Sequence, residues 1–142
     1  MLTILVGSQG GNALNLAQVI GDELNDSGIS NQCFPMDQIA AESLLEFSRV
    51  LIVTSTYGDG EAPDNASELL SFIKFNELDL TKLEYAVLGL GDNYYPHFCQ
   101  CAKDFDQYLS GHGARSLIER LDCDLYFEEQ YPEWLQRLKA QL

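Results

Sequence analysis

The chain has 142 residues, which is the length of one domain, and 46% of them are hydrophobic, enough to form a core. Its 22 acidic and 8 basic side chains give a formal net charge of -14. This charge argues against nucleic acid and anionic membrane surfaces as partners. It favours a protein partner with a basic face, and an acidic surface that only keeps the protein soluble is the alternative.

Strand-like and helix-like segments alternate along the whole chain. Runs of apolar and β-branched residues predict strands at residues 2–6, around 33–34, and at 50–54, 85–90 and 115–121. Apolar residues with helical spacing predict helices at residues 13–24, 68–75, 101–109 and 133–142, with a short helix or irregular crossover over 39–47. We expect Pro132 in the first turn of the last helix, and Asp64 or Asn65 as the cap of the helix that starts near Ala66.

This alternation predicts an α/β fold with a parallel sheet and helices on both faces. Five strands fit the doubly wound order 2-1-3-4-5, in which ligands bind at the switch between strands 1 and 3. The loops at that switch are residues 7–12 and 54–65. We expect one domain, residues 1–142, which is a monomer.

The loop after the third strand carries hydroxyl groups, an aromatic ring and glycines in succession. Thr54, Ser55 and Thr56 stand where the strand ends, and Tyr57 follows them. An aromatic residue between hydroxyl groups and the flexible Gly58-Asp59-Gly60 suits a flat, polar ligand, although an ordinary connecting loop with a tyrosine is the alternative.

The loop after the first strand is rich in glycine and leads into a helix. Its backbone N–H groups and the helix dipole favour an anion, and Ser8 and Asn12 add side-chain donors. No Lys or Arg occurs before Arg49, so the loop lacks the lysine of a triphosphate-binding P-loop. The loop suits one phosphate bound by hydrogen bonds alone, and a tight turn without a ligand is the alternative.

The loop after the fourth strand, residues 91–98, brings several aromatic side chains to the same edge of the sheet. An exposed aromatic cluster is unfavourable without a partner, and a planar ring stacked between two tyrosines supplies one. The alternative is that Tyr94 and Phe98 pack on the flanking helices, and we expect this for one of them. Together, the three loops describe a ligand with one phosphate and a flat ring.

These loops resemble the three FMN-binding loops of flavodoxins. The resemblance lies in Ser8-Gln9-Gly10-Gly11-Asn12-Ala13, in Ser55-Thr56-Tyr57-Gly58-Asp59-Gly60, and in Gly89-Leu90-Gly91-Asp92 with Tyr95, His97 and Phe98. It is strongest to the FMN domains of diflavin reductases and to short-chain flavodoxins of the MioC type. It implies a flavodoxin-like three-layer sandwich with FMN as the cofactor.

The resemblance also implies roles for the residues. Ser8, Gln9, Gly10, Gly11, Asn12 and Ala13 would surround the phosphate, and Ser55 and Thr56 would meet the ribityl chain or the ring edge. Tyr57 and Tyr95 would stack on the two ring faces, while Gly58, which is followed by Asp59 and Gly60, would offer its carbonyl to flavin N5. The pyrimidine side would be lined by Leu90, Gly91, Asp92, Asn93, His97, Phe98 and Cys99. Related phosphate loops carry threonines where Gly10 and Asn12 stand, so two hydroxyl donors are missing here.

By resemblance, the protein is an electron carrier rather than an enzyme, without catalytic residues of its own. It would pass single electrons from an NADPH-fed flavodoxin reductase to metal-cluster or haem enzymes. One alternative is an FMN-dependent reductase acting on NAD(P)H and a quinone. Another is a scaffold that no longer binds flavin. A phosphorylated receiver domain would need paired acids after the first strand, where this chain has Gly7-Ser8.

The four cysteines, Cys33, Cys99, Cys101 and Cys123, have neither the spacing of a redox motif nor that of a metal site. No run approaches the roughly 20 apolar residues of a membrane span. The first seven residues lack the basic region of a signal peptide. Free thiols in such a chain predict a cytoplasmic location, without a membrane as partner.

Overall fold

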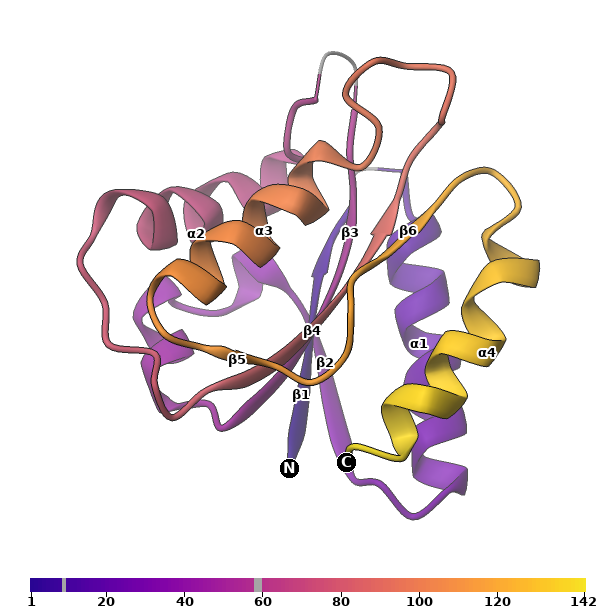
Figure 1. Cartoon of the computed structure of the whole chain (residues 1–142), viewed down its shortest axis with the longest axis horizontal. Coiled ribbons are helices and arrows are strands. Elements are labelled where there is room, and N and C mark those ends of the chain that lie inside the picture. The colour runs from indigo at the N-terminus through magenta and orange to yellow at the C-terminus, as the bar shows by residue number, and fades with distance from the viewer. Residues whose placement is uncertain (9, 58–59) are drawn as a thin grey trace.

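The computed structural model describes residues 1–8, 10–57 and 60–142. A parallel sheet lies between two layers of helices, with α2 and α3 on one face and α1 and α4 on the other (Figure 1). The strands are β1 (Leu2–Gly7), β2 (Asn31–Pro35), β3 (Arg49–Ser55), β4 (Glu84–Leu90), β5 (Arg115–Ser116) and β6 (Leu121–Cys123). The helices are α1 (Asn12–Asp26), α2 (Asp64–Phe75), α3 (Gln100–Gly111) and α4 (Phe127–Lys139), with two short 3-10 helices at Met36–Gln38 and Ala41–Glu46.

The sheet order is β2-β1-β3-β4-β5, and β6 pairs with β4 as well. All of these pairs are parallel, with Val6 opposite Val53 and Val53 opposite Leu88. The predicted α/β fold and the order 2-1-3-4-5 are therefore confirmed. The 3-10 helix at Ala41–Glu46 lies within the crossover that the sequence predicted over 39–47.

The fifth strand differs from the prediction, which placed one strand over 115–121. Two short strands share this edge instead: β5 pairs with the start of β4, where Arg115 is opposite Glu84, and β6 pairs with its end, where Leu121 is opposite Leu88. The chain leaves the ladder between them, where the indole Nε1 of Trp134 donates to the Glu119 carbonyl at 2.8 Å. The strand is thus interrupted where the Trp134 side chain of α4 binds its backbone.

The last helix begins at Phe127, six residues earlier than predicted, so that Pro132 lies in its interior rather than in its first turn. Pro132 lacks the N–H that would bond the carbonyl of Glu128 in the first turn, and its ring crowds that carbonyl. Glu128 and Glu129 near the start and Arg137 and Lys139 near the end complement the helix dipole. The helix forms in spite of this proline because it buries Tyr131, Trp134, Leu135 and Leu138 and has favourable charges at both ends.

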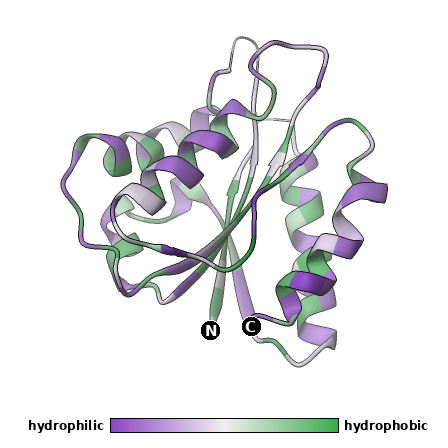
Figure 2. Cartoon of the chain, viewed as in Figure 1, coloured by the Kyte–Doolittle hydropathy of each residue, from purple (hydrophilic) through white to green (hydrophobic). Residues whose placement is uncertain are grey.

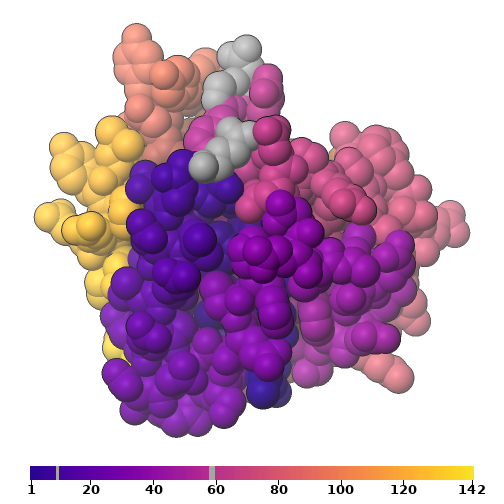
Figure 3. All heavy atoms as spheres, turned by 180° about the vertical axis from the view of Figure 1, so that it is seen from behind, coloured from indigo at the N-terminus to yellow at the C-terminus, as the bar shows by residue number. Residues whose placement is uncertain are grey.

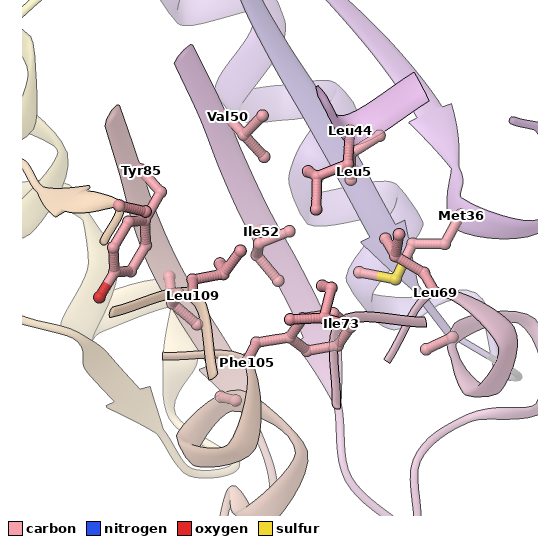
Figure 4. Close-up of a cluster of buried hydrophobic side chains, with 14 of the residues drawn as sticks. Leu5, Met36, Leu44, Val50, Ile52, Leu69, Ile73, Tyr85, Phe105 and Leu109 are labelled. Atoms are coloured by element: carbon pink, nitrogen blue, oxygen red, sulfur yellow. The ribbon is translucent and has the colours of Figure 1, made fainter. Parts of the chain in front are cut away.

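Two separate cores fill the space between the sheet and its helices. Adjacent β3 residues point to opposite faces: Val50 and Ile52 join the core under α2 and α3, while Leu51 and Val53 join the core under α1 and α4. Figure 4 shows Ile52, Ile73 and Phe105 meeting in the first core, and Figure 2 shows apolar residues concentrated on the strands between the layers. Burial on both faces explains the continuous apolar runs of these strands.

None of the helices in the described ranges combines the length and the apolar character that crossing a membrane requires.

Candidate functional site

A cavity of about 340 Å³ opens at the carboxyl edge of the sheet. The loops that gather at the top of Figure 1 form it. Its volume falls within the range of about 300–1,000 Å³ that is usual for small-molecule sites. The cavity is lined by Gly10, Asn12, Ser55, Thr56, Tyr57, Leu90, Gly91, Asp92, Tyr95, His97, Phe98, Cys99, Asp124, Leu125 and Phe127.

Most predicted site residues of the described chain line this cavity, but five do not: Ser8, Gly11, Ala13, Gly60 and the exposed Asn93. Ser8, Gly11 and Ala13 belong to the loop after β1 or to the start of α1, and Ala13 is fully buried. Gly60 has a φ of +96°, and a Cβ there would lie 2.8 Å from the Cβ of His97, so only glycine fits between the two loops. The predicted contacts of Gln9, Gly58 and Asp59 lie outside the described residues.

The start of α1 has the features of an anion site. Gly11, with φ of 86°, precedes the helix, and its N–H donates to the Ser8 hydroxyl oxygen at 3.0 Å. Within the described chain no side chain caps α1, and its first turn holds no acidic residue. The first N–H groups of the helix and its dipole are therefore available to a phosphate.

The loop after β3 contacts both neighbouring loops. The N–H of Gly10 donates to the Tyr57 hydroxyl at 2.9 Å, which places the end of this side chain at the glycine-rich loop. The Thr56 hydroxyl accepts the N–H of Cys101 at 2.9 Å and so holds the first turn of α3. The sequence predicted only a ligand contact for Thr56, and the structure adds this structural role.

Neither residue predicted to cap α2 does so, because the helix follows Pro63 and has no side-chain cap within the described chain. Asp64 is the first residue of the helix and Asn65 the second. The Asn65 side chain turns instead to the loop after β1, where its Oδ1 accepts the Ser8 N–H at 2.9 Å. The capping prediction is wrong for both residues.

The loop after β4 separates its aromatic side chains between core and surface. Phe98 packs against the core under α2 and α3, whereas the Tyr94 side chain is 85% exposed. This confirms the prediction that one of these two side chains packs, and the residue that does so is Phe98. Tyr95 lines the cavity and is 50% exposed, and its ring lies edge-on to that of Tyr94, with 5.6 Å between centroids.

A fourth segment completes the cavity, and the sequence analysis missed it. Asp124, Leu125 and Phe127 follow β6, and the Asn93 amide nitrogen donates to the Asp124 carboxylate at 3.2 Å. The pairing of Cys123 with Leu90 brings this segment to the wall. A signal was present in the sequence: Asp92-Asn93-Tyr94 and Asp124-Leu125-Tyr126 share one pattern.

That shared pattern forms the same turn twice. The Tyr94 N–H donates to the Asp92 carboxylate at 3.0 Å, and the Tyr126 N–H donates to the Asp124 carboxylate at 2.8 Å. Aspartate commonly bonds the backbone two residues further on in this way. Each turn leaves its tyrosine exposed, and neither tyrosine lines the cavity.

Three of the four cysteines are buried close to the cavity. Cys99 borders it and has a φ of 53°, and its thiol donates to the carbonyl of Cys123 at 3.6 Å. Burial raises the pKa of Cys99, Cys101 and Cys123 to about 12. These thiols are therefore neutral near pH 7 and pack as small apolar groups.

Alkylation of the native protein at pH 8 should modify Cys33 first and leave the other three thiols intact. The thiolate is the reactive form, and Cys33 is the only half-buried cysteine of the four, although burial raises its pKa too. Mass spectrometry after treatment with iodoacetamide measures this. Equal modification of all four without denaturant would contradict the buried, neutral state of the three thiols.

The cavity fits FMN by the chemistry of its walls. Aromatic rings of Tyr57, Tyr95 and Phe98 suit a flat ring system, and neutral N–H donors at the start of α1 suit a phosphate. None of the described lining residues is Lys or Arg. A ligand with one phosphate therefore fits better than one with a chain of phosphates.

Comparison with known proteins gives the same family for nearly the whole chain. The flavodoxin family model matches residues 4–134. The chain is 44% identical over 134 residues to the sulfite reductase (NADPH) flavoprotein alpha-component of Vibrio parahaemolyticus, covering 94% of this chain and 22% of that protein. The corresponding protein of Bacillus subtilis is 40% identical over 136 residues, covering 95% and 22%. The chain spans about a fifth of the length of these relatives.

Solved structures with a similar fold belong to the same family. A flavodoxin of Streptococcus pneumonia TIGR4 superposes with a TM-score of 0.85 at 28% identity, and flavodoxin 2 from Bacillus cereus with a TM-score of 0.87 at 25% identity. Each comparison covers 99% of both chains. Flavodoxins bind FMN, so the predicted cofactor is confirmed. From the family match over residues 4–134 and these relatives, this chain belongs to the flavodoxin family.

Proposed function

We propose that this FMN-binding protein carries single electrons from an NADPH-dependent flavodoxin reductase to metal-cluster or haem enzymes. In this proposal it acts in the cytoplasm as a monomer of one domain, and it turns over no substrate itself. Bound FMN supplies the chemistry, since it accepts and donates electrons one at a time. The observation that carries the proposal is the single cavity shared by Tyr57, Tyr95 and the loop that leads into α1.

We propose that the protein binds FMN with its phosphate at the start of α1 and its ring among the aromatic side chains. Ser8 to Ala13 would hold the phosphate, and Ser55 and Thr56 the ribityl chain. Tyr57 and Tyr95 would lie on the two ring faces, and residues 90–99 along the pyrimidine side. The segment of Asp124, Leu125 and Phe127 would close the remaining wall and limit the access of water to the ring.

The names of the relatives support an NADPH-fed donor, because they are flavoprotein components of an NADPH-dependent sulfite reductase. This chain matches about a fifth of the length of these relatives. We propose that the part that oxidises NADPH is a partner outside these 142 residues.

Anaerobic addition of NADPH separates the carrier from the alternative of a direct NAD(P)H:quinone reductase. The described residues that line the cavity include no Lys or Arg for the phosphates of NADPH. The flavin absorbance of the FMN-loaded protein should therefore persist with NADPH alone and disappear when a flavodoxin reductase is added in catalytic amount. Bleaching by NADPH alone would favour the direct reductase.

Acidic side chains gather at the cavity end of the molecule, whereas two arginines lie at the opposite end of the sheet. Glu61, Asp64 and Asp92 belong to the loops around the cavity or to the start of α2. At the opposite end of the sheet, Arg49 and Arg115 pair with Glu84 at the start of β4. This arrangement supports docking of a basic partner at the cavity end.

Electron transfer from a basic-faced reductase should slow as the salt concentration rises through the physiological range. Salt screens the attraction between exposed charges, with a Debye length of about 8 Å at physiological ionic strength. The rate should fall less steeply with salt in the variant Glu61→Gln/Asp64→Asn, since both side chains are exposed.

Stopped-flow kinetics over a range of ionic strength measure this effect. Asp22→Asn is the control. It removes one exposed charge in the second half of α1, whereas the cavity lies at the start of that helix. A rate that does not depend on salt would contradict electrostatic docking at this end. So would an equal change of slope in the control.

A further inference from the structure

Asn65 joins the two loops that flank the switch point of the sheet. Its side-chain oxygen accepts the Ser8 N–H at 2.9 Å across 57 residues of chain, and its side-chain nitrogen donates to the Val6 carbonyl at 3.5 Å. Figure 3 shows the start of α1, in indigo, beside the magenta segment near the start of α2. Asn65 is half-buried, so water competes only in part for these bonds.

A second hydrogen bond continues this connection to the helix. The Ser8 hydroxyl oxygen accepts the N–H of Gly11, the left-handed residue directly before α1. Two bonds in series therefore link α2 to the start of α1, through the backbone and then the side chain of Ser8. The first N–H groups of α1 follow at once, and these are the donors best placed for a phosphate.

The chemistry of this position favours asparagine. The side chain here contacts a backbone donor, the Ser8 N–H, and a backbone acceptor, the Val6 carbonyl. An asparagine amide carries the matching acceptor oxygen and donor nitrogen on one short side chain. Aspartate would keep only the acceptor and would add a negative charge beside an anion site. Since Asn65 does not cap its own helix, local helix formation does not explain its contacts.

We propose that Asn65 is a positioning residue for the phosphate end of the FMN site. It holds the loop after β1 in the shape that presents the start of α1, and it thereby sets the preference of the protein for FMN over riboflavin, which lacks the phosphate. This inference rests on the proposed placement of FMN in the cavity.

The test compares FMN with riboflavin in titration calorimetry of the full chain freed of flavin. Asn65→Ala should weaken FMN binding about tenfold, which corresponds to 1.4 kcal/mol, and change riboflavin binding by less than about twofold. Asn65→Leu fills a similar volume without either polar atom, and it should give the same pattern if the alanine variant folds poorly. Asn76→Ala is the matched control, because Asn76 makes one bond to the Phe72 carbonyl at the other end of α2.

Amide hydrogen exchange in the flavin-free protein tests the contact independently of FMN. The N–H groups of Ser8 and Gly11 should exchange faster in Asn65→Ala than in the unmodified chain, while Asn76→Ala leaves them unchanged. Unaltered exchange in Asn65→Ala would overturn the inference.

The inference would also fall if FMN and riboflavin lost affinity equally, because Asn65 would then support the site as a whole. Failure of the unmodified chain to bind FMN, with Ser8 and Gly11 still protected, would instead overturn the proposed function. The hydrogen-bonded connection would in that case stand without a phosphate role.

Discussion

Replacement of Tyr57 by alanine is expected to weaken FMN binding by roughly 1–3 kcal/mol, about 5- to 150-fold. Stacking of an aromatic side chain on a planar ring accounts for a loss of this size. Tyr57 is half-buried in the cavity wall, and its hydroxyl also accepts the Gly10 N–H, so the change removes a ring and a contact with the glycine-rich loop. Titration calorimetry with FMN measures the effect.

Two further variants separate the contributions at this site. Tyr57→Phe keeps the ring and removes the hydroxyl, so it should retain most of the affinity if stacking dominates. Tyr95→Ala should also weaken FMN binding by roughly 1–3 kcal/mol, because Tyr95 lines the cavity from another loop. Tyr94→Ala is the control, since Tyr94 is adjacent in sequence but 85% exposed and outside the lining. Unchanged affinity in both Tyr57→Ala and Tyr95→Ala would refute the sandwich of two tyrosines.

Replacement of Gly89 by alanine is expected to destabilise the fold by about 1–3 kcal/mol, the usual cost of overpacking a core. A Cβ at Gly89 would lie 2.5 Å from the Cβ of Ala102 on α3 and 3.3 Å from the Cys99 sulfur. Neither neighbour has a flexible end that can turn away, so α3 must move off the sheet. Because Cys99 borders the cavity at the start of α3, FMN affinity should fall together with stability.

Urea denaturation of the flavin-free protein measures the free energy of unfolding. Gly111→Ala is the matched control, because a Cβ at Gly111, the last residue of α3, meets no atom within 4 Å. That variant should unfold at the same urea concentration as the unmodified protein or at a slightly higher one. A Gly89→Ala protein as stable as this control would show that α3 does not pack closely on β4.

The sequence predicted the strand order because buried parallel strands have a local signature. Val50 to Val53 form an apolar run that fits a strand covered on both faces. The fifth strand was predicted as one strand, and its interruption coincides with contacts to side chains of other elements. Arg120 pairs with Asp106 of α3 at 2.6 Å, and Trp134 of α4 binds the Glu119 carbonyl. Neither contact is visible in a local pattern.

The candidate site shows the same division between local and distant signals. Three loops were found because the ends of parallel strands meet at one edge of the sheet. The segment after β6 was missed because it reaches the cavity through the pairing of Cys123 with Leu90, which is distant in sequence. Asn65 was assigned to a helix cap because capping is a local preference, whereas its observed partner is Ser8, 57 residues away.

Titration of the flavin-free protein with FMN, and separately with riboflavin, tests the central claim most directly. Binding is followed by the quenching of flavin fluorescence. We expect one FMN per chain and weaker binding of riboflavin, because only FMN carries the phosphate that the start of α1 can hold. Equal affinity for the two flavins would remove the phosphate site from the account, and no binding of FMN would contradict the function proposed for the cavity.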